Sequence, residues 1–246
     1  MWFVILSLAV QALLIVHCIK TGRNQIWIWV LALLSYAGII AYVAAELIPE
    51  LLKSGTTKRA VRDVKKALDP EADLRRLAQR AEIGGGVEAR QRHAEELLRL
   101  NRPQEAVAEY KLALVGLYEH DANLMLGLAR AHFAAGNPGE ARATLDELIR
   151  HNASFRSADG HLLYARSLEQ EGLAQRALDE YKVLAGYYPG AEATVRYARL
   201  LRAQGKNDTA GEVLRALAAQ AAVAPAHYRR TQEEWLKQAE RELAAL

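Results

Sequence analysis

The sequence predicts an all-α protein: two transmembrane helices, then an α-solenoid of about four helix–turn–helix repeats, then a C-terminal cap helix. Three observations predict it. Four turn residues recur 35, 36 and 33 residues apart, each has an alanine seven residues before it and five after it, and two long uncharged stretches precede them. The turn residues are Asn101, Gly136, Gly172 and Gly205, the preceding alanines are Ala94, Ala129, Ala165 and Ala198, and the following ones are Ala106, Ala141, Ala177 and Ala210.

Residues 1–52 are expected to form a transmembrane helical hairpin. Residues 2–19 and 26–45 contain no charged side chain, and each stretch approaches the length needed to cross about 30 Å of bilayer hydrocarbon. Trp27 and Trp29 stand at one end of the second stretch, where an indole ring favours the membrane interface. No Lys or Arg precedes Lys20, so the first stretch lacks the basic region that begins a cleaved signal peptide.

Basic side chains near the membrane predict the orientation of the hairpin. The connecting loop contains Lys20 and Arg23, whereas six basic residues follow the hairpin. This imbalance predicts a multi-pass protein of the bacterial inner membrane with both chain ends in the cytoplasm. The same basic stretch is expected to contact lipid headgroups; it lacks interleaved aromatic residues, so no nucleic-acid partner is expected. The six residues are Lys53, Lys58, Arg59, Arg62, Lys65 and Lys66.

The remainder of the chain divides into three parts. Residues 53–86 are predicted to be a basic juxtamembrane linker with a helix that begins at Asp69 and ends at Gly84–Gly86. Residues 87–225 contain the repeats. Residues 226–246 are expected to form one amphipathic helix, with Trp235 and Leu236 on the face that covers the last hairpin.

The repeats resemble the tetratricopeptide repeat family, whose period is near 34 residues with small residues at two fixed offsets. The large residue that follows the family's turn is present nine residues after each turn here, although the family's opening Trp is absent and its closing Pro is clear only as Pro189. The resemblance implies stacked helical hairpins that hold other proteins on a concave surface and carry no chemistry of their own. The four large residues are Tyr110, Leu145, Tyr181 and Leu214.

The resemblance also implies which positions line the concave groove. One groove position is occupied by Arg130, Arg166 and Arg199 in three consecutive repeats. Because a guanidinium suits a carboxylate, these arginines predict a protein partner with an acidic segment or a C-terminal carboxylate. The alternative is that they pair with acidic neighbours such as Glu169 and Glu192. The full predicted partner-binding set is Arg92, Arg130, Arg166, Arg196, Arg199, Arg202, Leu126, Phe133, Leu162 and Leu163.

No enzymatic activity, cofactor or metal site is expected. The seven histidines show no H-x3-H or HExxH spacing, and no Walker, Gly-x-Ser-x-Gly or Gly-x-Gly-x-x-Gly pattern occurs. The single cysteine, Cys18, excludes a disulfide framework and a cysteine-based metal cage.

The hairpin resembles the N-terminal membrane segment of phospholipase D-type cardiolipin synthases, through Trp29 and residues 35–42. The synthase activity that this resemblance would imply needs two His-x-Lys-x4-Asp motifs, which are absent. We therefore expect a membrane-anchored adaptor or scaffold that binds a protein partner in its groove. Two alternatives stay open: an accessory or remnant of a phospholipid-synthesis system, and a periplasm-facing scaffold for envelope assembly.

Overall fold

The structure, a computed structural model, describes all residues except 1, 22–25, 34, 48–68, 70 and 85. The chain divides into two compact units, Met1–Ala72 and Asp73–Leu246, and the predicted basic linker of residues 53–68 lies outside the described residues. The described residues contain helices and turns but no strand, as the sequence predicts for an all-α chain.

The first unit packs a long helix against shorter ones. Its core contains Cys18, Leu31 and Tyr42, which are fully buried, and Gln11 Nε2 donates to the carbonyl of Leu31 at 3.1 Å. None of the helices in the described part of the chain is both long enough and apolar enough to span a membrane. The elements are α1 (Trp2–Lys20), α2 (Ile26–Leu33), α3 (Ser35–Tyr42) and the π-helix η1 (Val43–Leu47).

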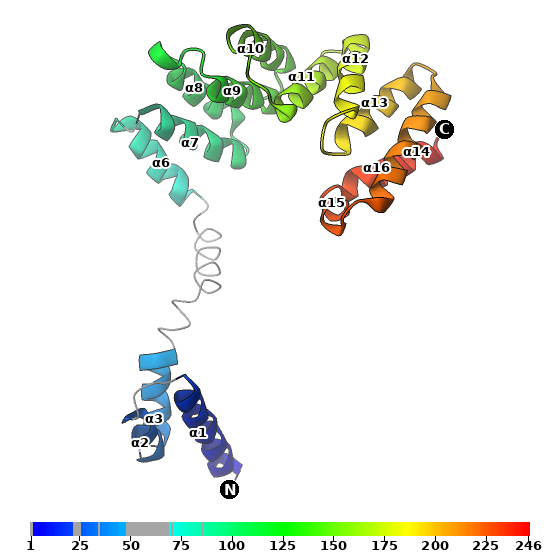
Figure 1. The fold of residues 1–246 in the computed structure, drawn as a ribbon. Helices are drawn as coiled ribbons and strands as arrows, with labels where there is room; N and C mark the ends of the chain where they lie inside the picture. The colour runs from blue at the N-terminus through cyan, green and yellow to red at the C-terminus, as the bar shows by residue number, and fades with distance from the viewer. Residues whose placement is uncertain (1, 22–25, 34, 48–68, 70, 85) are drawn as a thin grey trace. The chain divides into compact units, whose positions relative to one another are not determined.

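In the second unit, helices follow one another along an arch in Figure 1. Successive helices pair into the hairpins α7–α8, α9–α10, α11–α12 and α13–α14, and each hairpin packs on the next. The helices are α6 (Ala72–Glu82), α7 (Gly86–Arg99), α8 (Pro103–Ala113), the 3-10 helix η2 (Gly116–Tyr118), α9 (Ala122–Ala134), α10 (Pro138–His151), α11 (Ala158–Gln170), α12 (Ala174–Ala185), α13 (Glu192–Ala203), α14 (Asn207–Val223), α15 (Ala226–Thr231) and α16 (Glu233–Ala244).

All four predicted turn residues have the left-handed backbone that ends a helix. Their φ angles are 59° at Asn101, 79° at Gly136, 77° at Gly172 and 74° at Gly205. Each turn also closes with the same pair of backbone hydrogen bonds: at the second turn, Gly136 N donates to Phe133 O at 3.1 Å and Asn137 N donates to His132 O at 3.0 Å. This Schellman geometry satisfies the last carbonyls of the first helix, so the recurring Gly or Asn has a direct backbone cause.

The recurring alanines lie where the two helices of a hairpin cross. All eight are buried, with side chains no more than 1 % exposed. A methyl group is the largest side chain that such a close crossing accommodates. The large residues nine positions after each turn are also buried, at 3 % exposure or less, and they fill the space between hairpins. The predicted repeat architecture is confirmed.

Both ends of the solenoid differ in detail from the predicted division. Leu74 of α6 is buried in one cluster with Ala94 and Leu97 of α7, so the structure groups α6 with the repeats rather than with the linker. The predicted single cap helix is divided at Gln232 into α15 and α16. Gln232 Oε1 accepts from Ala191 N at 3.0 Å, a tertiary contact that accompanies the break.

The turn geometry predicts opposite effects for two glycine substitutions. Gly172→Ala is expected to lower the free energy of unfolding by about 1 kcal/mol, because a Cβ meets nothing within 4 Å there but the positive φ strains it. Gly139→Ala, in α10, is the matched control: its nearest neighbour would be 3.9 Å away, and helix propensity favours alanine by up to about 1 kcal/mol. Urea denaturation of both variants measures the change in the free energy of unfolding, and a change of the same sign in both would contradict the left-handed turn assigned to Gly172.

Candidate partner-binding groove

The arginines at the shared groove position each reach an acidic side chain on the first helix of the next hairpin or on the cap. Arg130 Nη2 lies 3.9 Å from Asp159 Oδ2 of α11, and Arg166 Nε lies 3.6 Å from Glu192 Oε1 of α13. Arg199 Nε lies 3.0 Å from an oxygen of Glu242, in α16. These contacts show that the three arginines lie on one face of the stack, where they link consecutive hairpins and the last hairpin to the cap helix.

Arg196 is the most enclosed of the predicted groove arginines, with 18 % of its side chain exposed. Its guanidinium donates to Glu192 at 2.8 Å and to Glu169 at 3.0 Å and lies over the ring of Trp235, 5.2 Å from the centroid. Burial lowers the pKa of Arg196, but the interaction with Tyr181, the hydrogen bond to Glu192 and the negative charges of Glu169 and Glu192 together outweigh it, so the pKa is raised. This arginine is held by acids of its own chain, which is the alternative that the sequence analysis left open.

The cap helix α16 supplies the acidic partner of two further predicted arginines, Arg199 and Arg202. The carboxylate of Glu242 accepts from Arg199 and also lies 2.8 Å from Nη1 of Arg202. Arg199 donates a second bond to Gln238 at 3.2 Å. At the first hairpin, Arg92 pairs with Glu88 at 2.6 Å on the exposed face of α7. Four of the six predicted arginines therefore have a carboxylate of the chain within 3.0 Å, and three of them, Arg92, Arg196 and Arg199, donate a hydrogen bond to it.

Arg130 and Arg166 differ from the other four. Half of the Arg130 side chain is exposed, and its nearest carboxylate lies beyond hydrogen-bond distance. The Arg166 guanidinium lies 4.7 Å from the centroid of the Phe133 ring, in a cation–π contact. Its Nε is buried and has no hydrogen-bond partner among the described residues. These two arginines, on α9 and α11, have the most unused donor capacity.

The predicted apolar contacts lie mainly inside the solenoid. Leu126, Leu162 and Leu163 are 5–7 % exposed and belong to core clusters, so packing between hairpins accounts for them. Phe133 is half-buried beneath Arg166. Leu126 alone of the three leucines also borders a cavity at the groove.

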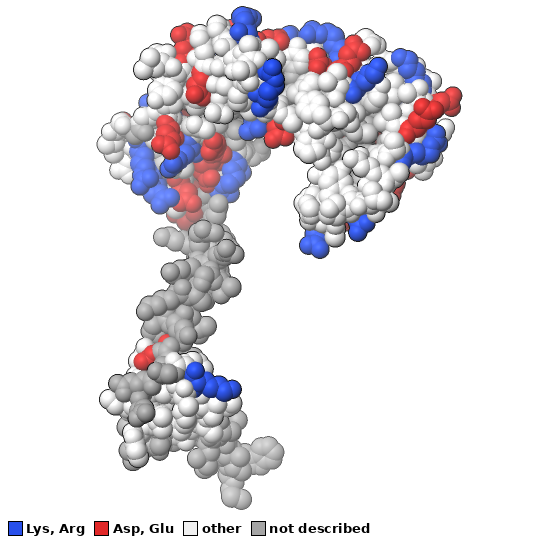
Figure 2. Space-filling view, viewed as in Figure 1, with Lys and Arg blue, Asp and Glu red and all other residues white. Residues whose placement is uncertain are grey.

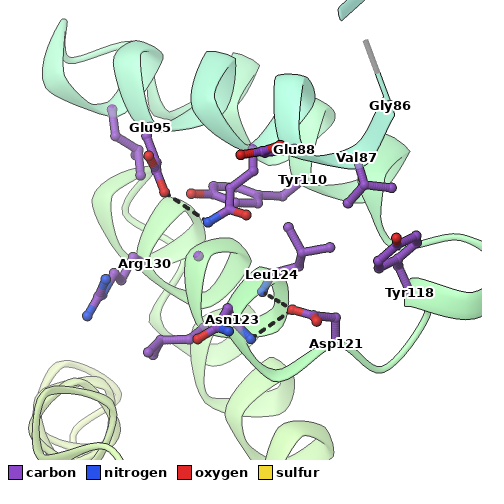
Figure 3. A pocket seen from close by; sticks show the side chains of 14 residues that line it. Gly86, Val87, Glu88, Glu95, Tyr110, Tyr118, Asp121, Asn123, Leu124 and Arg130 are labelled. Atoms are coloured by element: carbon purple, nitrogen blue, oxygen red, sulfur yellow. Dashed lines mark hydrogen bonds between the residues drawn. The ribbon is translucent and has the colours of Figure 1, made fainter. Parts of the chain in front are cut away.

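That cavity has a volume of about 620 Å³ and lies between α7 and α9, and Tyr110 of α8 is among the residues that line it. Figure 3 shows Glu88 and Glu95 on one side of the Tyr110 ring and Leu124, Asp121 and Arg130 on the other. Asp121 caps α9 by accepting from Asn123 N and Leu124 N, each at 3.0 Å. The cavity is therefore lined by polar and charged side chains together with Leu98, Leu124 and Leu126.

Electrostatics in the cavity centre on Tyr110. Burial, followed by the negative charge of Glu95, raises its pKa to about 12, while Arg130 opposes the shift. The phenol is therefore neutral at physiological pH and keeps its proton for hydrogen bonding. Away from the cavity, Figure 2 shows basic and acidic side chains interspersed over the face in view.

The sequence analysis missed the cavity and two acidic partners of the groove arginines, Asp159 and Glu242, although it named Glu169 and Glu192 as alternative partners. From the sequence, Tyr110 is only the large residue that follows the first turn, and Glu95 stands at the groove position where the next three repeats have arginine. An available signal is the alignment of the repeats with one another, which places Leu98 and Gly127 opposite Glu169 and Arg196 of the third and fourth repeats. Glu242 has no such signal, since it lies 43 residues from Arg199.

Comparison with known proteins supports the repeat assignment. Residues 97–167 match the tetratricopeptide repeat family. The tetratricopeptide-like repeats of a putative kinesin light chain from Podosopora anserina are similar in fold, with a TM-score of 0.51 and 19% identity over 65% of this chain and 87% of that one. The structure is thus a tetratricopeptide-like solenoid, a fold that typically presents an extended concave surface for binding other proteins.

Two further structures are similar. A MamA protein gives a TM-score of 0.49 and 18% identity, over 80% of this chain and 92% of that chain. PilF of Pseudomonas aeruginosa gives 0.46 and 20%, over 79% and 96%. No curated protein matches the chain. None of the reported similarities supports the resemblance of the N-terminal hairpin to cardiolipin synthases.

Proposed function

We propose that this protein is a membrane-anchored adaptor that binds a protein partner in the groove of its repeats. The proposed anchor is the N-terminal pair of uncharged stretches, residues 2–19 and 26–45, and the basic residues that follow favour a cytoplasmic location of the repeats. Anionic lipid headgroups interact with the same basic residues. The groove recruits its partner to the membrane and performs no chemistry.

The exposure of Arg130 carries the proposal for the groove. Its guanidinium is half exposed and has its nearest acid at 3.9 Å, and it borders the cavity between α7 and α9. Arg166 follows one repeat later, with its nearest acid at 3.6 Å. An acidic segment or a C-terminal carboxylate of the partner would satisfy donors that the chain itself leaves unused.

Membrane anchoring is tested by removing residues 1–52. The full chain should stay in the membrane fraction after an alkaline wash, and the shortened chain should be soluble, helical and cooperatively unfolding. A reporter active only in the cytoplasm, fused after Leu246, should be active. Recovery of the shortened chain in the membrane pellet would refute the anchor, and a reporter active only in the periplasm would move the repeats to the other side.

The groove is tested with a photo-crosslinking residue at Asn123, an exposed position on the rim of the cavity. In intact membranes, Arg130→Glu should lower the yield of the crosslinked partner about tenfold, because it replaces attraction by repulsion. Arg150→Glu on α10, also exposed, is the control and should leave the yield unchanged. Equal yields in both variants, with helicity preserved, would refute an acidic ligand at this position.

A further inference from the structure

Two tyrosines at the same repeat position have different surroundings. Tyr181 donates its hydroxyl proton to Glu169 at 2.6 Å, and Arg196 donates to the same carboxylate oxygen at 3.0 Å. Tyr110 is at the equivalent repeat position: it follows Asn101 by nine residues, as Tyr181 follows Gly172. Where Tyr181 has Glu169 and Arg196, Tyr110 has Leu98 and Gly127.

The two replacements leave the Tyr110 hydroxyl without a partner. Only 2 % of Tyr110 is exposed, it lines the cavity, and no described residue forms a hydrogen bond with its hydroxyl. A Cβ at position 127 would lie 2.4 Å from the ring and 2.7 Å from the hydroxyl oxygen. The Tyr110 ring therefore packs directly against the backbone at Gly127, in the space that a side chain at this position would need. The hydroxyl oxygen is accessible from the cavity rather than fully enclosed, so it is available to a ligand that enters there.

The charge of the cavity indicates what is missing. Glu95 stands at the groove position where the next three repeats have arginine. One of its oxygens accepts from Gln91 at 3.0 Å, and the other accepts no bond within the described residues. Across the cavity, Asp121 uses only Oδ1 for its helix cap. Compared with the surroundings of Tyr181, this place keeps one carboxylate and loses both guanidinium groups. Glu169, Arg166 and Arg196 correspond by repeat position to Leu98, Glu95 and Gly127.

We propose that the cavity between α7 and α9 binds an arginine side chain of an extended partner segment. The guanidinium of the ligand pairs with Glu95 beside Tyr110 in the cavity, much as Arg196 pairs with Glu169 beside Tyr181. A backbone carbonyl of the same segment accepts the Tyr110 hydroxyl proton. Arg130 leans towards Asp159, on the far side, and remains available for an acid elsewhere in the segment. This inference rests on the proposed groove function and adds the chemistry of one residue of the partner.

The test uses the full chain in detergent micelles and a fluorescein-labelled peptide, Gly-Ser-Gly-Arg-Gly-Ser-Gly, with blocked ends. The matched probe carries citrulline, which has the shape of arginine without its charge. Fluorescence anisotropy should show tighter binding of the arginine peptide. Tyr110→Phe should weaken it about 3- to 10-fold by removing one hydrogen bond. Glu95→Gln should weaken it about 2- to 5-fold, as expected for an exposed ion pair.

Tyr181→Phe is the matched control, because it removes the equivalent hydroxyl where the chain supplies its own partners. It should lower the melting temperature and leave peptide binding unchanged, whereas Tyr110→Phe should leave the melting temperature unchanged. Equal affinity for the two peptides, no saturable binding, or equal behaviour of the two tyrosine variants would overturn the arginine site. The Asn123 crosslink and its loss in Arg130→Glu would stand in that case, so failure of this inference is distinguishable from failure of the groove function.

Discussion

Tyr181→Ala is expected to lower the free energy of unfolding by about 3–5 kcal/mol, the usual cost of removing a buried aromatic ring. The ring is fully buried between the third and fourth hairpins, in one cluster with Leu162, Leu168 and Leu184. Helices of both hairpins pack around the ring, so the hole left by its removal would not close easily. Urea denaturation followed by circular dichroism measures the loss.

The hydroxyl accounts for a separate part of this loss. Burial first, and then the hydrogen bond to Glu169, raise the pKa of Tyr181, so the phenol is a neutral donor at physiological pH. Tyr181→Phe should therefore cost about 1.5–3 kcal/mol, as for a hydrogen bond to a charged group. If the alanine variant were no less stable than the phenylalanine variant, the ring would not be the packing element between the two hairpins.

The sequence was most informative where a residue type has one physical cause. Asn101 and the three glycines mark the turns because a left-handed backbone excludes most side chains. Ala129 and Ala141 mark a crossing because only a small side chain fits there. These causes are local, so they recur with the repeat and are visible in an unaligned chain. The division of the cap helix at Gln232 was not visible, since its contact with Ala191 spans 41 residues.

The groove was predicted less completely, because the function of an arginine depends on what its neighbours leave free. The sequence places Arg130 and Arg199 at equivalent positions, yet one is half exposed and the other bonds to the cap. The acids nearest to these two arginines, Asp159 and Glu242, lie on the next repeat and on the cap, so no local pattern reveals them. Differences between repeats are more informative here than their similarity, as Tyr110 and Tyr181 illustrate.

Ending the chain at Ala224 is expected to destabilise the last hairpin by about 3–5 kcal/mol. Helix α16 packs against α13 and α14, and its Trp235, Leu236 and Leu243 are partly buried against a cluster that includes Leu214 and Leu217. A fully buried large apolar side chain contributes about 1.5–3 kcal/mol, so three partly buried ones give roughly this total. The truncation also leaves Arg199 and Arg202 without the carboxylate of Glu242.

The loss should be confined to the end of the solenoid, because each repeat is stabilised mainly by its neighbours. Hydrogen exchange measured by mass spectrometry should rise in α13 and α14 and stay unchanged in α7 to α10. Glu242→Gln is the control: it keeps the apolar cover and weakens only ion pairs of partly exposed arginines, at a cost of about 1 kcal/mol or less. Uniformly increased exchange along the whole stack would show that the repeats unfold as one block. Unchanged exchange in α14 would show that α16 is not its cap. In the expected case, the freed Arg199 and Arg202 would also extend the basic side of the groove, and an acidic peptide should bind the truncated chain more tightly than the full chain.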